Sequence, residues 1–137
     1  MEHSKGIPVK EVIATKGAPR AIGPYSQGIL VENILFCSGQ IPINPKTGEL
    51  VSGSIEEQTR QVLDNLGAVL KEAGMDYHDV VSVTVFMYDM DNFARINQVY
   101  AEYFKVNDQP PARCAVEAAR LPKDAGVEIS LIAIKTQ

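Results

Sequence analysis

The fold is decided by residues 54–88, which read SIEEQTRQVLDNLGAVLKEAGMDYHDVVSVTVFMY. Ser54 is followed three residues later by Glu57, the capping-box pattern of a helix N-terminus, and Gly74 is typical of a helix end. Between these two signals apolar residues recur at helical spacing, at Ile55, Val62, Leu66, Leu70 and Ala73. The pattern predicts a helix with one buried face, followed by a strand at Val80–Tyr88 that is rich in β-branched and aromatic residues.

The chain after this stretch predicts a second helix and two more strands. The helix is expected from about Asn92 to Lys105, because its apolar residues share one face. The pair Pro110 and Pro111 then breaks the chain before a short strand at Ala112–Ala118. A loop leads to a last strand at Val127–Lys135, so that helices and strands alternate in this half of the chain.

The chain before residue 54 predicts strands and turns only. A first strand is expected at Lys10–Thr15, and Ser26–Glu32 with Ile34–Gly39 is typical of a hairpin that turns at Asn33. The segment Pro42–Gly48 is dense in turn-forming residues and predicts a surface loop. The order of all elements predicts an α+β domain in which a mixed β-sheet carries both helices on one face.

The last strand also bears on assembly, because it ends in Leu131, Ile132, Ala133 and Ile134 and is apolar on both of its faces. A sheet that is covered by helices on one side leaves its other face open to water. An open face that carries Val, Ile and Phe predicts contacts with other subunits, and therefore a homo-oligomer.

Length and composition are those of one soluble domain, residues 1–137, with 45% hydrophobic and 22% charged residues. The net charge of −4 argues against a nucleic-acid partner, because phosphate binding relies on cationic surfaces. Met1–Lys10 lacks the apolar core of a signal peptide, and no apolar run approaches the ~20 residues that span a bilayer. We therefore expect a cytoplasmic protein without a membrane partner.

Common chemical motifs are absent from the sequence, including the GxGxxG, GxxxxGK[ST], HExxH and GxSxG patterns. The two cysteines, Cys37 and Cys114, are not in C-x-x-C spacing, which predicts neither a disulfide framework nor a zinc site. The two histidines, His3 and His78, are expected to be solvated surface residues. No metal or cofactor is therefore expected.

Polar residues within apolar strands are the remaining candidates for chemistry. Ser38 and Gly39 stand at the end of one strand, Arg113 opens another, and Glu128 lies early in the last. Each has a purely structural alternative: Ser38 could end its strand, Arg113 could cover an edge, and Glu128 could face solvent or pair with Arg113 in a structural salt bridge. In the functional interpretation, the arginine fork binds a carboxylate, the glutamate orients a water, and backbone N–H groups near Gly39 hold the second carboxylate oxygen.

Six blocks of sequence, in order, closely resemble the reactive intermediate deaminase A family, which is also called RidA or YjgF. Together they cover about Val9–Lys135, which is nearly the whole chain. The blocks read GAPRAIGPYSQG, FCSGQIPINPKTGEL, QVLDNLGAVLKEAG, VTVFMYDMDNFARIN, PPARCAVEAARLPKD and VEISLIAI. The resemblance implies a chorismate-mutase-like fold, a homotrimer with ligand clefts between subunits, and hydrolysis of 2-enamine and 2-imine intermediates, such as 2-aminoacrylate and 2-aminocrotonate, to 2-keto acids and ammonia.

The resemblance also implies roles for particular residues. Arg113 stands where the family binds the substrate carboxylate, and Glu128 stands where it positions the attacking water. The pocket residues implied are Tyr25, Ser38, Gly39 and Asn97, with Phe93 as a packing neighbour.

One residue departs from the family pattern, because many members carry a cysteine two residues after the motif arginine. That position is Ala115 here, and Cys114 lies one residue earlier, where strand alternation directs it to the opposite face. A mechanism based on water survives this change, whereas a thiol nucleophile at that point does not.

Two other functions stay open at the level of sequence. The first is a non-catalytic or regulatory trimer that binds 2-keto acids or similar carboxylates in the same pocket. The second is the endoribonuclease or translation-inhibitor activity attributed to some relatives, against which the acidic charge argues.

Overall fold

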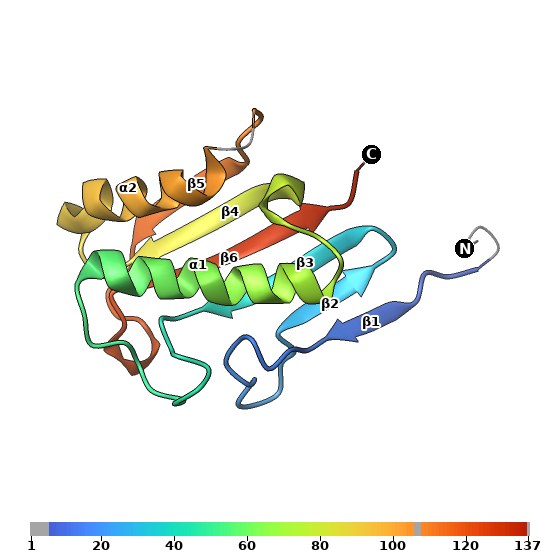
Figure 1. Ribbon diagram of the computed structural model, residues 1–137, viewed down its shortest axis with the longest axis horizontal. Helices are drawn as coiled ribbons and strands as arrows, with labels where there is room; N and C mark the ends of the chain where they lie inside the picture. The colour runs from blue at the N-terminus through green and yellow to red at the C-terminus, as the bar shows by residue number, and fades with distance from the viewer. Residues whose placement is uncertain (1–5, 106–107, 137) are drawn as a thin grey trace.

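A computed structural model describes residues 6–105 and 108–136 of the chain. Its helices are α1 (Ile55–Glu72) and α2 (Phe93–Phe104), and three short 3-10 turns lie at Tyr77–Asp79, Met90–Asn92 and Pro122–Asp124. Its strands are β1 (Lys10–Ile13), β2 (Gly28–Val31), β3 (Ile34–Gln40), β4 (Val80–Met87), β5 (Ala112–Glu117) and β6 (Val127–Ile134). The strands form one sheet in the order β1-β2-β3-β6-β4-β5 (Figure 1).

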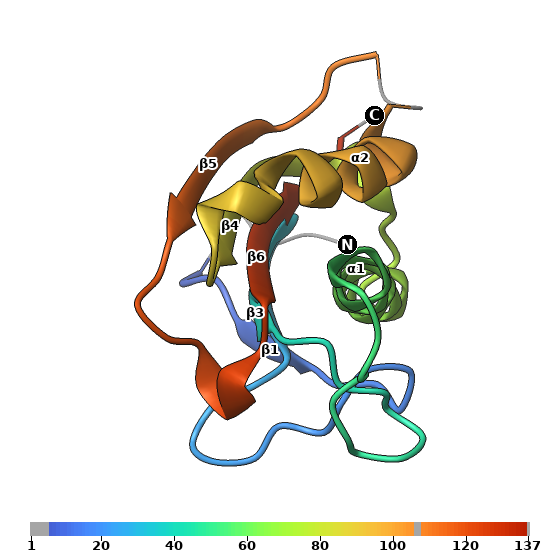
Figure 2. The same cartoon turned by 90° about the vertical axis from the view of Figure 1, so that its left-hand side faces the viewer.

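The sheet is mixed, because β4 and β5 run parallel whereas every other pair of neighbours is antiparallel. The two helices lie on the same side of it, as the edge-on view shows (Figure 2). Their apolar faces pack on alternate residues of the central strands, including Leu35, Val83, Val85, Ile129 and Leu131. The α+β fold with both helices on one face, predicted from the order of elements, is confirmed.

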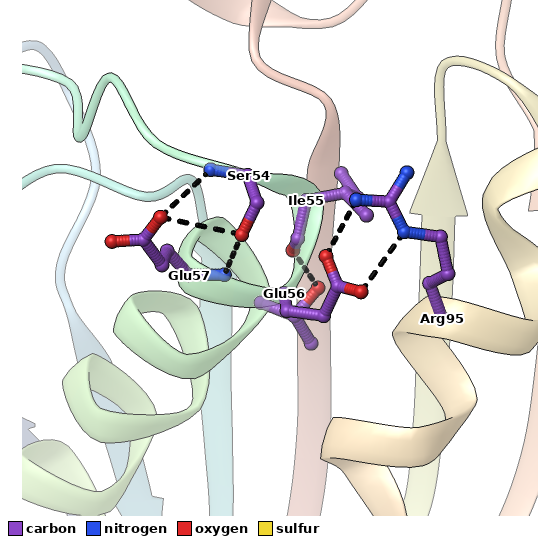
Figure 3. Close-up of polar contacts among 6 residues, drawn as sticks. Ser54, Ile55, Glu56, Glu57 and Arg95 are labelled. Atoms are coloured by element: carbon purple, nitrogen blue, oxygen red, sulfur yellow. Dashed lines mark hydrogen bonds and ion pairs between the residues drawn. The ribbon is translucent and has the colours of Figure 1, made fainter.

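The helix predicted from Ser54 to Gly74 is confirmed together with its cap (Figure 3). The Glu57 N–H donates to Ser54 Oγ at 3.2 Å, and the Ser54 N–H donates to Glu57 Oε1 at 3.0 Å. Gly74 has a φ of +76°, a conformation that favours glycine and ends the helix. Arg95 of α2 donates two hydrogen bonds to Glu56, at 2.9 and 2.7 Å, and so joins the two helices at the surface.

The predicted strands are all present, but several end at other residues. β1 stops at Ile13, because the Thr15 N–H donates to the side chain of Gln27 and not to a neighbouring strand. β3 was predicted to end at Gly39, but it continues to Gln40. Its continuation requires a β-bulge against β6, which is described below because it lies in the candidate site.

The face of the sheet opposite the helices is apolar over much of its area, as predicted. Val12, Ile29, Phe36 and Ile132 form one row across four strands, and Phe36 is 45% exposed. We call this surface the open face. Its burial in an oligomer stays a prediction. Among the described residues, no helix has the length and apolar character needed to cross a membrane.

Candidate functional site

Arg113 is held against α2 by an amide and two aromatic rings. It lies on edge strand β5 beside Val83, a buried residue of the helix-covered face. Its Nη1 donates to Asn97 Oδ1 at 2.6 Å, and its guanidinium carbon lies 4.8 Å from the ring centre of Tyr100 and 5.5 Å from that of Phe93. We call these four residues the arginine cluster. No carboxylate within residues 6–105 or 108–136 forms an ion pair with Arg113.

A cavity of about 520 Å³ opens beside the arginine cluster, with Asn97, Tyr100 and the turn at Pro110 and Pro111 in its wall. The Tyr100 hydroxyl is buried without a hydrogen-bond partner in the described part of the chain. Burial raises the pKa of Tyr100, and the positive charge of Arg113 opposes this shift. Tyr100 therefore stays neutral and offers its ring face to the guanidinium, an arrangement that favours a cation.

Glu128 lies on the open face, where it is partly buried. It pairs with Phe86 across β6 and β4, and burial raises the pKa of its carboxyl above the ordinary range. Ser38 and Gly39 both lie opposite Ser130, because the register moves from Cys37–Leu131 to Gln40–Ile129. Bulges of this kind redirect side chains beside functional sites.

The bulge brings the backbone of Gly39 directly against the Glu128 carboxylate. A Cβ atom on Gly39 would overlap Glu128 Oε2, so only glycine leaves room for this approach. A glycine inside an apolar strand is the sequence signal that could have located the bulge. Ser38 does not end its strand, because β3 continues past it to Gln40, and Glu128 lines a cavity.

That cavity has a volume of about 580 Å³, and Tyr25, Ser38, Gly39 and Glu128 contribute to its wall. We call these four residues the glutamate cluster. Tyr25 comes from the loop between β1 and β2 and is 51% exposed. The Ser38 hydroxyl donates to the Ser26 carbonyl at 2.6 Å, which ties this loop to the bulge.

Gln27 fixes the same loop, although it belongs to none of the candidate residues predicted from the sequence. Its side chain is buried, accepts from the Thr15 N–H at 2.6 Å and donates to the Thr15 and Pro19 carbonyls at 3.1 and 2.7 Å. The sequence signal for this role is a glutamine among the turn residues of GPYSQG. A buried side-chain amide can form the hydrogen bonds that loop backbone groups would otherwise form with a neighbouring strand.

The two clusters lie on opposite faces of the sheet in one chain. Arg113 pairs with Val83 and Glu128 pairs with Phe86, and these two positions of β4 point in opposite directions because they are three residues apart. The structural salt bridge between Arg113 and Glu128, one alternative from the sequence, therefore does not form within one chain. Within a single chain, Arg113 lies beside Asn97, and Glu128 lies beside Ser38 and Gly39. The two groups do not lie beside each other.

The cysteines lie where strand alternation predicts. Cys114 pairs with Thr84 on the open face and is exposed, whereas Ala115 pairs with Val85 on the face of Arg113. Cys37 is buried under the helices, and burial raises the pKa of its thiol to about 12, so it is not a nucleophile at neutral pH.

His78 is exposed, as expected, and His3 lies outside the described residues. No group of three or more metal-ligating side chains occurs within the described ranges.

Comparison with known families matches residues 15–135 to the family described as Endoribonuclease L-PSP. A RutC family protein of Pyrococcus horikoshii is 58% identical, over 93% of this chain and 99% of its own length. A protein of Escherichia coli and one of Homo sapiens, both named 2-iminobutanoate/2-iminopropanoate deaminase, are 47% and 46% identical. Each match covers 93% of this chain, with 99% of the E. coli protein and 91% of the human one.

Solved structures show the same similarity. The Rid family protein YyfA of Yersinia pestis is 53% identical, with a TM-score of 0.89 over 93% of this chain and 100% of its own. The E. coli protein TdcF, solved with bound serine, is 42% identical, with a TM-score of 0.88 over 92% of this chain and 99% of its own.

Proposed function

The chain belongs to the Endoribonuclease L-PSP family and is similar to Rid and RutC family proteins, and we propose that it hydrolyses 2-enamine and 2-imine acids to 2-keto acids and ammonia. The names of the E. coli and human relatives support this chemistry. The observation that carries it to particular residues is the state of Arg113, a guanidinium that is held in place and has no carboxylate partner among the described residues. Such a fork is prepared for the carboxylate of a ligand.

In the proposed reaction, the enamine first tautomerises to the imine. Arg113 binds the substrate carboxylate, and Asn97 and Tyr100 keep the guanidinium in place. Glu128, as a carboxylate, accepts a proton from a water whose oxygen attacks the imine carbon. Glu128 returns this proton to the nitrogen, which gives a carbinolamine. The proton of the carbinolamine hydroxyl then passes to the nitrogen, the carbon–nitrogen bond breaks, and ammonia leaves as the keto oxygen forms. General acid–base help of this kind contributes about 10²–10⁴-fold.

The separation of the two clusters leads to a proposal about assembly. Among the described residues, Arg113 in one cluster forms no ion pair with a carboxylate, and Glu128 in the other forms no ion pair with a cation. We propose a homotrimer in which the arginine cluster of one subunit meets the glutamate cluster of its neighbour. The open face, with its row of apolar side chains, would be buried in this trimer and would stabilise it.

A second candidate is ligand binding without catalysis. The structure of E. coli TdcF contains serine, a small amino acid with a carboxylate. This observation supports ligand binding without catalysis as much as it supports binding of a substrate. The endoribonuclease activity in the family's description finds no support in the charge of this chain, because a net charge of −4 opposes phosphate binding.

The experiment couples the purified protein to a dehydratase that releases 2-aminoacrylate or 2-aminocrotonate, and follows the keto acid. Acceleration by the wild type, lost in Arg113→Ala, supports the proposal. Saturable binding of a 2-keto acid without acceleration supports the binding candidate. If Arg113→Ala is as fast as the wild type, the assignment of the site is wrong. Incubation with RNA, before and after a further purification step, tests the ribonuclease description.

A further inference from the structure

The wall of the cavity at the glutamate cluster also includes two basic side chains that have no role in the proposed reaction. Arg20 and Lys123 both lie in its wall, on the loop between β1 and β2 and on the turn before β6. Neither forms an ion pair within residues 6–105 or 108–136, whereas the exposed Arg60, Arg95 and Arg120 each pair with a carboxylate. With one carboxylate, Glu128, the wall carries an excess of positive charge in a protein of net charge −4.

The backbone that carries Arg20 is fixed by buried groups. Ala18 is 3% exposed, and Gln27 Nε2 donates to the carbonyls of Ala18 and Pro19 at 3.3 and 2.7 Å. The buried side chain of Gln27 therefore holds Pro19, the residue before Arg20. As a result, the Arg20 side chain extends from a defined point on the cavity wall.

The turn that carries Lys123 is equally defined. Leu121 and Ala125 are buried on either side of it, and the Ala125 N–H donates to the Pro122 carbonyl at 3.1 Å. Lys123 itself has a φ of +56°, a conformation that is uncommon for a residue with a side chain. Uncommon backbone of this kind, held by its surroundings, is concentrated at ligand-binding sites.

The size of the cavity leaves room for more than a small imine. About 580 Å³ lies within the range of sites for much larger ligands, so a three- or four-carbon substrate fills only part of it. Arg20 and Lys123 form part of the wall of this cavity, and their charges favour an anionic group.

We propose that Arg20 and Lys123 bind a second carboxylate on the substrate, so that the imines of dicarboxylic amino acids are preferred to imines with alkyl side chains. This inference rests on the proposed function. In it, Arg113 of the neighbouring subunit holds the first carboxylate, Glu128 orients water at the imine carbon, and the second carboxylate reaches the two cations.

The test compares kcat/KM for a dicarboxylic and an alkyl imine, both released in place by an amino-acid oxidase. We expect the wild type to favour the dicarboxylic imine by about 10-fold, since exposed cations contribute modestly. Arg20→Ala and Lys123→Ala should each remove most of this preference and change the alkyl reaction by less than about threefold. Lys71→Ala, a change on the exposed surface of α1 away from the cavity, is the matched control and should keep the preference.

Binding measurements separate this inference from the proposed function. Calorimetry with a 2-oxo dicarboxylate and a 2-oxo monocarboxylate needs no catalysis, and the double variant should lose the preference for the former. If the wild type hydrolyses no imine, the proposed function fails, and the binding preference still tests the two cations. Equal preference in the wild type and the double variant overturns the inference. Loss of assembly in the variants with an unchanged preference overturns it too, and assigns the cations to a subunit contact.

Discussion

The arginine cluster and the glutamate cluster hold their charges in different ways. Arg113 lies on an edge strand, where an amide oxygen and two aromatic faces hold a guanidinium without neutralising it. Glu128 lies on a central strand, where a β-bulge brings the backbone of Gly39 against it and burial disfavours its charge. The first cluster is built to keep a charge, and the second to make a carboxylate more basic. Under the proposed assembly, each cluster is half of a site.

The largest effect is expected for Glu128→Gln, which should lower kcat by about 10²–10⁴-fold because the general base is lost. Burial raises the pKa of Glu128, so wild-type activity should fall as the pH drops through this raised value, and the variant should lack that limb of the pH profile. A carboxyl with a raised pKa contributes stability below its unfolded pKa, and this contribution is lost as the pH rises through the folded pKa. At neutral pH the variant should therefore be at least as stable as the wild type by thermal unfolding. An unchanged pH profile would contradict the assignment.

Arg113→Ala should lower kcat/KM by about 30-fold to a few thousand-fold, equivalent to the roughly 2–5 kcal/mol lost when one partner of a buried charged pair is removed. Arg113→Lys should recover little of this, because an ammonium cannot form the two parallel hydrogen bonds of the arginine fork. Steady-state kinetics with an alkyl imine measures both variants. Arg95→Ala is the matched control, because Arg95 is an arginine of α2 that pairs with Glu56 of α1 at the surface. Equal losses in both variants would mean that a general effect on α2, and not carboxylate binding, is being measured.

Mixing the two inactive variants tests whether each site uses two chains. When Arg113→Ala and Glu128→Gln chains are unfolded and refolded together, about a quarter of the inter-subunit sites should combine an intact Arg113 with an intact Glu128. Activity should therefore recover to about a quarter of the wild-type level, while each variant refolded alone stays inactive. No recovery, with mixed trimers confirmed by mass spectrometry, would place both clusters of a working site in the same chain.

Gly39→Ala tests the contact between the bulge and the carboxylate. The new methyl group would overlap Glu128 Oε2 and displace this carboxyl, the free end of a flexible side chain, so we expect about a 10-fold lower kcat/KM and a change of less than about 1 kcal/mol in the free energy of unfolding. Chemical denaturation and kinetics measure the two effects. Gly6→Ala, where a Cβ meets no atom within 4 Å, is the control and should change neither. A fully active Gly39→Ala would show that the close approach has no part in positioning Glu128.

The smallest effect is expected for Ser54→Ala, far from both clusters. Removing the hydroxyl that accepts from the Glu57 N–H should lower the free energy of unfolding by about 1 kcal/mol, the typical value for an N-cap. Denaturant unfolding should show this loss, and kcat/KM at a temperature well below unfolding should not change. A fall in activity would mean that the N-terminus of α1 communicates with one of the clusters.

The pattern of residues predicted the elements well because each signal is local. The capping box at Ser54, the helical spacing after it and the β-branched run at Val80 need only their own neighbours, and these elements form where expected. The predicted ends of elements were less accurate where residues far away in the sequence determine the local hydrogen bonds. Gln27 ends β1 by satisfying Thr15, and the bulge at Ser38 and Gly39 extends β3, and both depend on partners elsewhere in the chain.

The candidate residues Arg113 and Glu128 could be named from the sequence, through the rarity of charges in apolar strands and the resemblance to a family. Their surroundings could not. The rings of Phe93 and Tyr100 approach Arg113 because Arg113 lies on the face of the sheet that α2 covers. Gly39 approaches Glu128 because a β-bulge shifts the register between β3 and β6.

The sequence by itself determined the elements, the α+β class and the identity of the charged residues, because periodicity, caps and residue chemistry are properties of short segments. Only the tertiary structure decided that Arg113 and Glu128 face opposite sides of the sheet in one chain. The physical reason is that the face of a strand residue depends on register and bulges, which are set by pairing between segments far apart in the chain.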